Sequence, residues 1–262
     1  MGRRQLAGKC AIITGASSGI GRELAIQLAA ENVDVVAVAR RQDRLQSLAQ
    51  EIGEGQGSCL PVVGDVTNAA DRENILTQCI SRFKRFDILI NCAGIGAMGR
   101  FDEASEVRLR QVFEVNFFAA AELMRSAIPL LEKSDDGLIV NIGSVLSHFA
   151  PPLKSEYCAS KFALRGLSES IRSELVSKNV ELLNVSPSTT DSEFFDVVIE
   201  DETGKNWKQR GAMSPSQVAK KTIAAMQRRK REIVLSSGGK FFVWLNKLAP
   251  NLASRILASH GQ

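Results

Sequence analysis

The chain has 262 residues, of which 44% are hydrophobic and 24% charged, so it can bury the core of an α/β domain. A net charge of +4 with two Trp and one Tyr supplies little of the aromatic and basic surface of a nucleic-acid-binding protein, and we expect no nucleic-acid partner. Five scattered cysteines and two histidines form no metal-binding pattern, and we find no signal peptide and no run of about 18 apolar residues, so we expect a cytoplasmic protein without a transmembrane segment or a metal site.

Short apolar runs rich in β-branched residues alternate with amphipathic patterns along the whole chain. Such alternation predicts right-handed βαβ crossovers and a parallel sheet covered by helices on both faces. We therefore predict the α/β class: one domain over residues 1–262 with a doubly wound parallel sheet of about seven strands. The predicted strands are residues 10–14, 33–39, 59–66, 86–94, 137–144, 180–187 and 232–237. The predicted helices are residues 20–30, 41–52, 69–83, a pair within 106–132, 156–177 and 215–229.

Two segments lie outside this alternation. Residues 188–213 are long and irregular for a loop of a compact domain, which is typical of a substrate lid. Residues 238–262 form a basic amphipathic extension that Pro250 interrupts. We favour packing of this extension against the domain or a partner subunit, while a pocket cover and contact with a membrane surface stay open.

The first predicted strand leads directly into a glycine-rich turn, TGASSGIGRELA. Gly15, Gly19 and Gly21 lie where the strand ends and a helix begins, so backbone N–H groups and the positive helix end can bind a pyrophosphate. The alternative is that these glycines only end a strand, which fits their place in the first βα unit less well. We therefore predict a dinucleotide site.

The end of the second predicted strand indicates which dinucleotide binds. NAD sites place an acidic residue there for the ribose, whereas NADP sites place positive charge there for the 2′-phosphate. The chain has Ala39 followed by Arg40 and Arg41. Paired arginines are often only solvated surface, but beside a glycine-rich turn they favour NADP(H) over NAD(H), with Arg40 as the main phosphate contact.

Six features in one order along the chain carry a resemblance to a known family. They are TGxxxGIG at 14–21, Asp65-Val66, NCAG at 91–94, Asn116, Ser144, and YxxxK at 157–161. Together they resemble the short-chain dehydrogenase/reductase family, over roughly residues 8–239. Two features depart from the family pattern: Cys92 replaces the commoner asparagine, and PSTTDS at 187–192 replaces PGxVxT.

The resemblance implies which residues line the cofactor. Those along the pyrophosphate are Gly15, Ser17, Ser18, Gly19, Ile20 and Gly21. Asp65 and Val66 would contact the adenine. Asn91, Ala93 and Gly94 would lie along the cofactor, with Asn91 also steadying the central strand. Pro187, Thr190 and Ser192 stand where the family holds the nicotinamide amide.

Tyr157 is the only tyrosine of the chain and stands four residues before Lys161, on the same face of a predicted helix. A phenol with its usual pKa near 10 is poorly matched to proton transfer at neutral pH, and we expect the Lys161 ammonium to lower the pKa of Tyr157. Ser144 ends the fifth predicted strand and can donate a hydrogen bond to a developing oxyanion. A Tyr-x-x-x-Lys pair alone is also compatible with an amphipathic surface.

The resemblance assigns these residues to catalysis. Tyr157 would be the general acid and base of a single NADP-binding Rossmann domain over residues 1–262. Both Tyr157 and Lys161 would also contact the cofactor, and Lys161 would hold its ribose. Asn116 would hold a water that links Lys161 to bulk solvent. By its own chemistry, Asn116 is equally compatible with a helix kink or a local cap.

These features predict an NADP(H)-dependent enzyme that interconverts a ketone or aldehyde and an alcohol by hydride transfer. Met98, Phe149, Phe194 and Phe195 point to an apolar substrate, although packing of the lid explains each of them equally well. Reduction of 3-oxoacyl chains on a carrier protein is the enzymatic alternative, and a non-catalytic dinucleotide-binding regulator is the alternative from another class. The resemblance also implies a homodimer or homotetramer.

Overall fold

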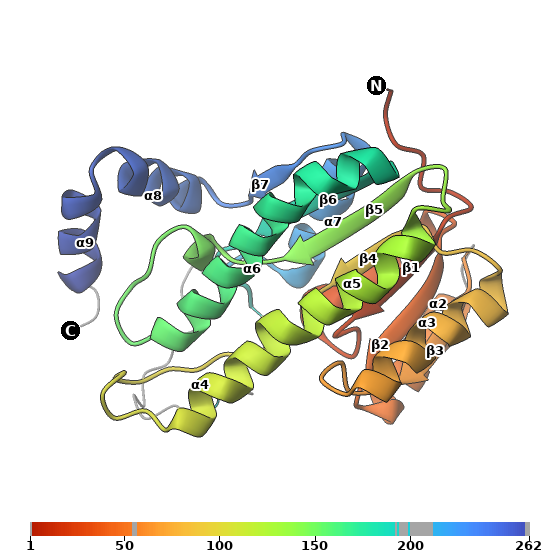
Figure 1. The fold of residues 1–262 in the computed structure, drawn as a ribbon, viewed down its shortest axis with the longest axis horizontal. Helices are drawn as coiled ribbons and strands as arrows, with labels where there is room; N and C mark the ends of the chain where they lie inside the picture. The colour runs from red at the N-terminus through yellow and green to blue at the C-terminus, as the bar shows by residue number, and fades with distance from the viewer. Residues whose placement is uncertain (1, 54–56, 192, 194–198, 200–211, 260–262) are drawn as a thin grey trace.

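A computed structural model describes residues 2–53, 57–191, 193, 199 and 212–259 of the chain (Figure 1). Within these residues seven strands form one sheet: β1 (Cys10–Thr14), β2 (Asp34–Ala39), β3 (Cys59–Val63), β4 (Ile88–Asn91), β5 (Gly137–Ile142), β6 (Val180–Ser186) and β7 (Glu232–Val234). Their order across the sheet is β3-β2-β1-β4-β5-β6-β7, and every neighbouring pair is parallel. The single-domain Rossmann fold predicted from the sequence is confirmed.

The helices alternate with the strands. They are α1 (Gly19–Ala30), α2 (Gln42–Gly53), α3 (Ala69–Phe83), α4 (Glu106–Phe113), the π-helix η1 (Glu114–Phe118), α5 (Ala119–Leu131), the 3₁₀ turn η2 (Val145–Ser147), α6 (Ser155–Leu175), the 3₁₀ turn η3 (Val176–Lys178), α7 (Pro215–Gln227), α8 (Ser237–Leu248) and α9 (Pro250–Ser259). The extension breaks at Pro250 as predicted, because proline begins α9 where its missing N–H costs no hydrogen bond.

Two apolar clusters pack the helices onto the sheet. Side chains of α1, α2 and α7 form one cluster on one face. Side chains of α3, α5 and α6 form the second cluster on the other face. Because both faces are covered, the strands are continuous apolar runs and not alternating ones.

Strand order reverses between β1 and β4, which lie side by side although two strands separate them in sequence. Ligands of open parallel sheets bind at such a switch point, beyond the carboxyl ends of the strands. Five strands end earlier than predicted, since residues 64–66, 92–94, 143–144, 187 and 235–236 belong to loops and residue 237 begins α8. These loops leave the sheet at that edge and supply residues to the site.

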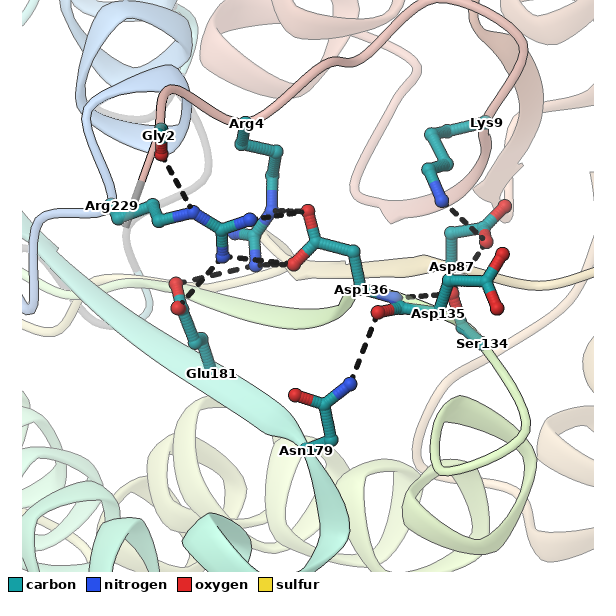
Figure 2. Close-up of polar contacts among 10 residues, drawn as sticks. All are labelled: Gly2, Arg4, Lys9, Asp87, Ser134, Asp135, Asp136, Asn179, Glu181 and Arg229. Carbon is teal, nitrogen blue, oxygen red and sulfur yellow. Dashed lines mark hydrogen bonds and ion pairs between the residues drawn. The ribbon is translucent and has the colours of Figure 1, made fainter.

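An ionic network lies at the other end of the strands, where β5 and β6 begin (Figure 2). Arg4 donates to Asp136 at 3.0 and 2.7 Å and to Glu181 at 3.2 Å, and 1% of its side chain is exposed. Arg229 donates to the same two carboxylates at 2.8–2.9 Å and to the carbonyl of Gly2 at 3.1 Å. Arg229 has a φ of 52°, an uncommon conformation for a side chain of its size, which this network holds. The network joins the N-terminal arm and the segment after α7 to the starts of β5 and β6.

Candidate active site

The glycine-rich turn packs against the segment that follows β4. Gly15 has a φ of 69°, and a Cβ atom there would lie 2.9 Å from the Cα of Ala93. A Cβ atom at Gly21 would lie 2.4 Å from the carbonyl oxygen of Gly15. Both positions therefore require glycine, and the turn lies directly at the switch point.

The start of α1 is suited to an anion. Ser18 is its N-cap residue with extended backbone angles, and the described first turn has neither a side-chain cap nor an acidic residue. Its first N–H groups are thus open to a ligand phosphate, and the helix dipole favours negative charge there. Gly19 has a φ of 54°, whereas Ile20 is partly buried against the core. The residues predicted to bind the pyrophosphate therefore form a cradle that fits it.

Two arginines border this cradle. Arg41 donates to the hydroxyls of Ser17 at 3.0 Å and Ser18 at 2.8 Å, and to the carboxylate of Glu193 at 3.0 Å. Arg40, the predicted phosphate contact, is 73% exposed and lies 3.9 Å from a carboxylate oxygen of Asp65. The sequence reasoning noted Arg41 but missed that its guanidinium contacts the glycine-rich turn.

Asp65 and Val66 follow β3 on the same edge. The Asp65 carboxylate accepts hydrogen bonds from the Thr67 backbone at 3.0 Å and from the Thr67 hydroxyl at 2.8 Å. Burial raises the pKa of Asp65, but these hydrogen bonds and the charge of Arg40 outweigh burial and lower it. Val66 packs against the core beside this carboxylate. Asp65 is therefore an ionised acceptor beside Arg40.

Residues after β4 line the centre of the edge. Asn91 donates to the side chain of Asn141 at 2.8 Å, which joins β4 to β5. The backbone N–H groups of Cys92 and Ala93 both donate to the hydroxyl of Thr14. The predicted cofactor residues after β4 thus belong to one rigid segment beside the glycine-rich turn.

The predicted catalytic residues meet at this edge. Ser144 ends the loop after β5, and its hydroxyl makes a hydrogen bond to Tyr157. The same hydroxyl accepts from the backbone N–H of Leu146 at 3.1 Å. Lys161 Nζ lies 5.8 Å from the centre of the Tyr157 ring and donates to the carbonyl of Ile142 at 3.1 Å. The structure therefore brings Ser144, Tyr157 and Lys161 together.

The electrostatics of this trio differ from the sequence-based expectation. Burial raises the pKa of Tyr157 to about 12, although the hydrogen bond from Ser144 acts in the opposite direction. Burial also lowers the pKa of Lys161 to about 8. The expected lowering of the Tyr157 pKa by Lys161 is wrong for this structure, because burial of the phenol is the largest cause of the shift and raises the pKa.

Asn116 lies in the π-helix η1, between α4 and α5. Its carbonyl oxygen accepts from the Ile95 N–H at 2.8 Å, and its amide donates to the Ile95 carbonyl and to Ser160, both at 3.0 Å. A Cβ atom at Gly94 would lie 3.2 Å from this carbonyl oxygen and 3.6 Å from Lys161 Nζ. Asn116 therefore joins the loop at Ile95 to Ser160 of α6, close to Lys161. It lies in a π-helix, a distortion that is common at functional sites.

The residues predicted near the nicotinamide are only partly described. Pro187 is buried, and its carbonyl accepts from Val145 at 2.9 Å. The hydroxyl of Thr190 donates to the carbonyl of Ser188 at 3.2 Å, which turns it toward its own loop. Ser192 lies outside the described residues.

Two of the residues predicted to indicate an apolar substrate are described, and one of them contacts the C-terminal extension. Met98 and Phe149 are both buried. Phe149 packs on Phe242 of α8 with ring centres 5.6 Å apart, and Asn246 donates to the carbonyl of His148 at 3.0 Å. The extension thus packs on the domain through α8, which was the favoured interpretation.

Another face of this extension is open. Large apolar side chains of α8 and α9 are exposed there: Phe241, Trp244, Leu248 and Leu252. No helix within the described residues has the length and apolar character that crossing a membrane requires. Phe194, Phe195 and most of the predicted lid at 188–213 lie outside the described residues.

Comparisons with known proteins agree with this geometry. A family model described as short chain dehydrogenase matches residues 9–203. A short chain dehydrogenase of Pseudocercospora fijiensis is 34% identical over 191 residues, which cover 72% of this chain but 62% of the fungal protein.

Two solved structures are similar over most of the chain. A short chain dehydrogenase/reductase of Burkholderia phymatum in complex with NAD has a TM-score of 0.87 and 25% identity, over 95% of this chain and 96% of that one. An alcohol dehydrogenase of Thermococcus sibiricus complexed with 5-hydroxy-NADP has a TM-score of 0.78 and 27% identity, over 87% of this chain and 95% of that one.

Proposed function

The chain belongs to the short-chain dehydrogenase family, and from this premise we propose that it uses NADP(H) to interconvert a ketone or aldehyde and an alcohol. The observation that carries the proposal is the trio at the sheet edge, in which Ser144 bonds to Tyr157 beside the buried Lys161. The glycine-rich turn and the start of α1 lie on the same edge and fit a pyrophosphate. When bound, the nicotinamide supplies or takes the hydride.

Tyr157 is the proton donor of the proposed reduction. With a pKa raised to about 12, its phenol is protonated at neutral pH and can donate to an oxygen that gains negative charge. The Ser144 hydroxyl donates a second hydrogen bond to the same oxygen. Lys161 stabilises the phenolate that remains after transfer, because it is protonated at neutral pH with a pKa of about 8. The charge state of the pair thus favours the reductive direction near neutrality.

We assign the preference for NADP(H) to both arginines after β2. Arg40 and Arg41 border the cradle, and Arg41 already bonds to two hydroxyls of the glycine-rich turn. Arg40→Asp should weaken NADPH binding far more than NADH binding, because it replaces a phosphate ligand with a like charge. Arg125→Asp is the matched control, since it makes the same charge change at an exposed residue of α5. Equal affinity of the wild type for NADPH and NADH would refute the preference.

The substrate is proposed to be apolar, with Met98 and Phe149 in the wall of its pocket. We also propose a homo-oligomer. Large apolar side chains are exposed on α4, η1 and α6, at Val107, Phe118 and Phe162, and light scattering on the purified protein measures its mass directly. A monomer at micromolar concentration would refute this part of the proposal.

The test of the function is an NADPH-oxidation screen over ketones, aldehydes and carrier-linked and free 3-oxoacyl substrates. Tyr157→Phe is the matched blank, because it removes one hydroxyl and keeps the ring. We expect turnover by the wild type and a loss of roughly 10²–10⁴-fold in the variant, with unchanged NADPH affinity. Activity only on carrier-linked 3-oxoacyl chains would show that the protein is instead a reductase of acyl chains bound to a carrier protein. Tight NADPH binding with no turnover on any substrate would instead assign a dinucleotide-binding regulator.

A further inference from the structure

Asn184 is a buried amide whose polar atoms lack an explanation. It lies in β6 with 4% of its surface exposed. Neither its Oδ1 nor its Nδ2 has a hydrogen-bond partner among the residues that the structure describes. Asn141, its neighbour at the same register in β5, is well bonded, to Asn91 at 2.8 Å and to Ser168 at 2.9 Å. Because native proteins rarely leave a buried amide unpaired, Asn184 calls for a ligand.

A small cavity beside Asn184 also reaches the active-site lysine. The centre of a water molecule can move within about 10 Å³ of this cavity. A cavity needs about this volume, measured in the same way, to hold one water. Its polar lining includes Asn184, Lys161 and Ser186. Lys161 carries three hydrogens on Nζ and donates one of them to Ile142 in the described structure. The cavity therefore offers a water both donors and acceptors.

We propose that this cavity binds one water molecule, held by the Asn184 amide, and that this water connects Lys161 to the protein surface at β7 through Ser186 and His148. The water-binding part stands by itself, whereas the role in proton transfer rests on the proposed function. This route leaves the active site on the β6 side of Lys161. Asn116 lies on the other side, toward α5, and its side chain is engaged by Ile95 and Ser160.

The outer part of the route consists of two short contacts made by His148 Nε2. Ser186 Oγ lies 3.1 Å from His148 Nε2, and both residues are buried. The same nitrogen lies 3.8 Å from a carboxylate oxygen of Glu232, whose side chain is 33% exposed. One imidazole nitrogen thus faces both a buried hydroxyl and an acid at the surface, so a proton taken up at Nε2 on the Glu232 side can be passed from the same atom to Ser186.

The proton balance is simple. Once Lys161 has given a proton to the reacting phenolate, the neutral amine takes one from the cavity water. That water takes one from the Ser186 hydroxyl, which takes one from His148 Nε2. His148 can supply this proton because its neutral ring has first taken one from solvent at Nε2, at the Glu232 edge, and it returns to the neutral form, with its other proton on Nδ1, when it donates. One proton therefore enters for each carbonyl reduced. Asn184 transfers nothing and only orients the water.

Several charged groups act on this histidine. Burial is the main reason that its pKa is lowered, and Arg165 and Lys247 lower it further, whereas Glu232 and Glu169 raise it. Because its pKa is lowered, this imidazole releases readily a proton that it has taken up.

The first test is a crystal structure of the wild type with resolution good enough to place ordered water. We expect one water within hydrogen-bond distance of the Asn184 amide and of Lys161 Nζ. An empty cavity in that map would overturn the site. This result does not depend on any activity, so it stays decisive even if the enzyme assay of the proposed function fails.

The second test is kinetic and uses whichever carbonyl substrate the wild type reduces. Ser186→Ala breaks the route, and Asn184→Leu removes the amide that holds the water. We expect kcat to fall by about tenfold in each, less than the roughly 10²–10⁴-fold that removal of a general acid costs. We also expect a larger solvent deuterium isotope effect on kcat, while KM and NADPH affinity stay unchanged. Thr222→Val is the control, because it removes a buried hydroxyl from α7.

The outcomes separate the possibilities. A lower kcat with the wild-type isotope effect would show that these residues only support the fold. Wild-type kcat and isotope effect in both variants would show that protons do not use this route. Either result would overturn the relay. Absence of turnover by the wild type would count against the proposed function and leave the water site to the crystallographic test.

Discussion

Lys161 is a buried cation, and its replacement should separate stability from activity. Burial lowers its pKa from the usual 10.5 to about 8. At about 1.4 kcal/mol per pKa unit, folding pays about 3 kcal/mol at neutral pH to keep this ammonium charged. Lys161→Met removes the charge and keeps much of the volume. It also leaves the carbonyl of Ile142 without its donor, which costs roughly 1–3 kcal/mol. We therefore expect an inactive variant that is as stable as the wild type at pH 7, or more stable.

The pH dependence gives a sharper prediction than the value at one pH. Below about pH 8 Lys161 is protonated in both folded and unfolded protein, and the whole penalty is present. Between about pH 8 and 10.5 the unfolded chain holds a proton that the folded chain has lost, so the wild type gains stability as pH rises. The advantage of Lys161→Met over the wild type should thus shrink by roughly 2–3 kcal/mol between pH 7 and pH 10. Tyr157, with its pKa raised from 10 to about 12, titrates above this range.

Urea unfolding followed by fluorescence at pH 7, 8, 9 and 10 measures this difference, given that the slope with denaturant is the same for both proteins. Lys220→Met, at an exposed residue of α7, is the matched control and should show no such trend. A difference in unfolding free energy between Lys161→Met and the wild type that stays constant from pH 7 to pH 10 would refute the reasoning.

Two further predictions concern charges at the edges of the molecule. Arg4→Met should lower the unfolding free energy by about 1.5–3 kcal/mol in urea titrations, since it removes charged hydrogen bonds, whereas the exposed Arg3→Met should not. Burial raises the pKa of Asp136, but its arginine partners outweigh burial and lower this pKa overall. The stabilisation by the network is therefore complete above about pH 4 and is lost as the pH falls further. If Arg4→Met lowered the unfolding free energy equally at pH 7 and at pH 3, the assignment would be contradicted. Glu193→Gln should tighten NADPH binding two- to fivefold, roughly 0.5–1 kcal/mol, because it removes the carboxylate that Arg41 binds and leaves Arg41 to bind the phosphate. Calorimetry measures both affinities, and an equal tightening of NADH binding would exclude this cause.

The alternation of apolar runs and amphipathic patterns was sufficient to predict the fold, because both faces of the sheet are buried and each strand is a continuous apolar run. Helix α3 begins and ends at the predicted residues 69 and 83, and the strand order follows from parallel crossovers. Strand ends were less accurate, since apolar runs continue from the sheet into the loops that carry the site. Residues 92–94 and 143–144 show this, because they leave the ladder to contact the glycine-rich turn and Tyr157.

The motifs identified the trio at the sheet edge but not its electrostatics. The spacing of Tyr157 and Lys161 puts two groups on one helix face, whereas their pKa values depend on how much water the surrounding elements exclude. In the same way, adjacent arginines cannot be ranked from a sequence. The choice of Arg41 as the contact to the glycine-rich turn depends on where Ser17 and Ser18 place their hydroxyls.

The distribution of polar groups explains how the fold tolerates a costly site. Asn91, Asn141 and Asn184 occupy the same register in β4, β5 and β6, so one row of amides crosses the sheet just below its carboxyl edge. Two of these amides bond to each other, and the third faces the cavity that reaches Lys161. Buried polar groups of this kind stabilise little, but they hold neighbouring strands in one arrangement when each is satisfied. The Lys161 ammonium is itself held by the carbonyl of Ile142 at the end of β5, the strand that Asn141 ties to β4, and this keeps a destabilising charge beside Tyr157.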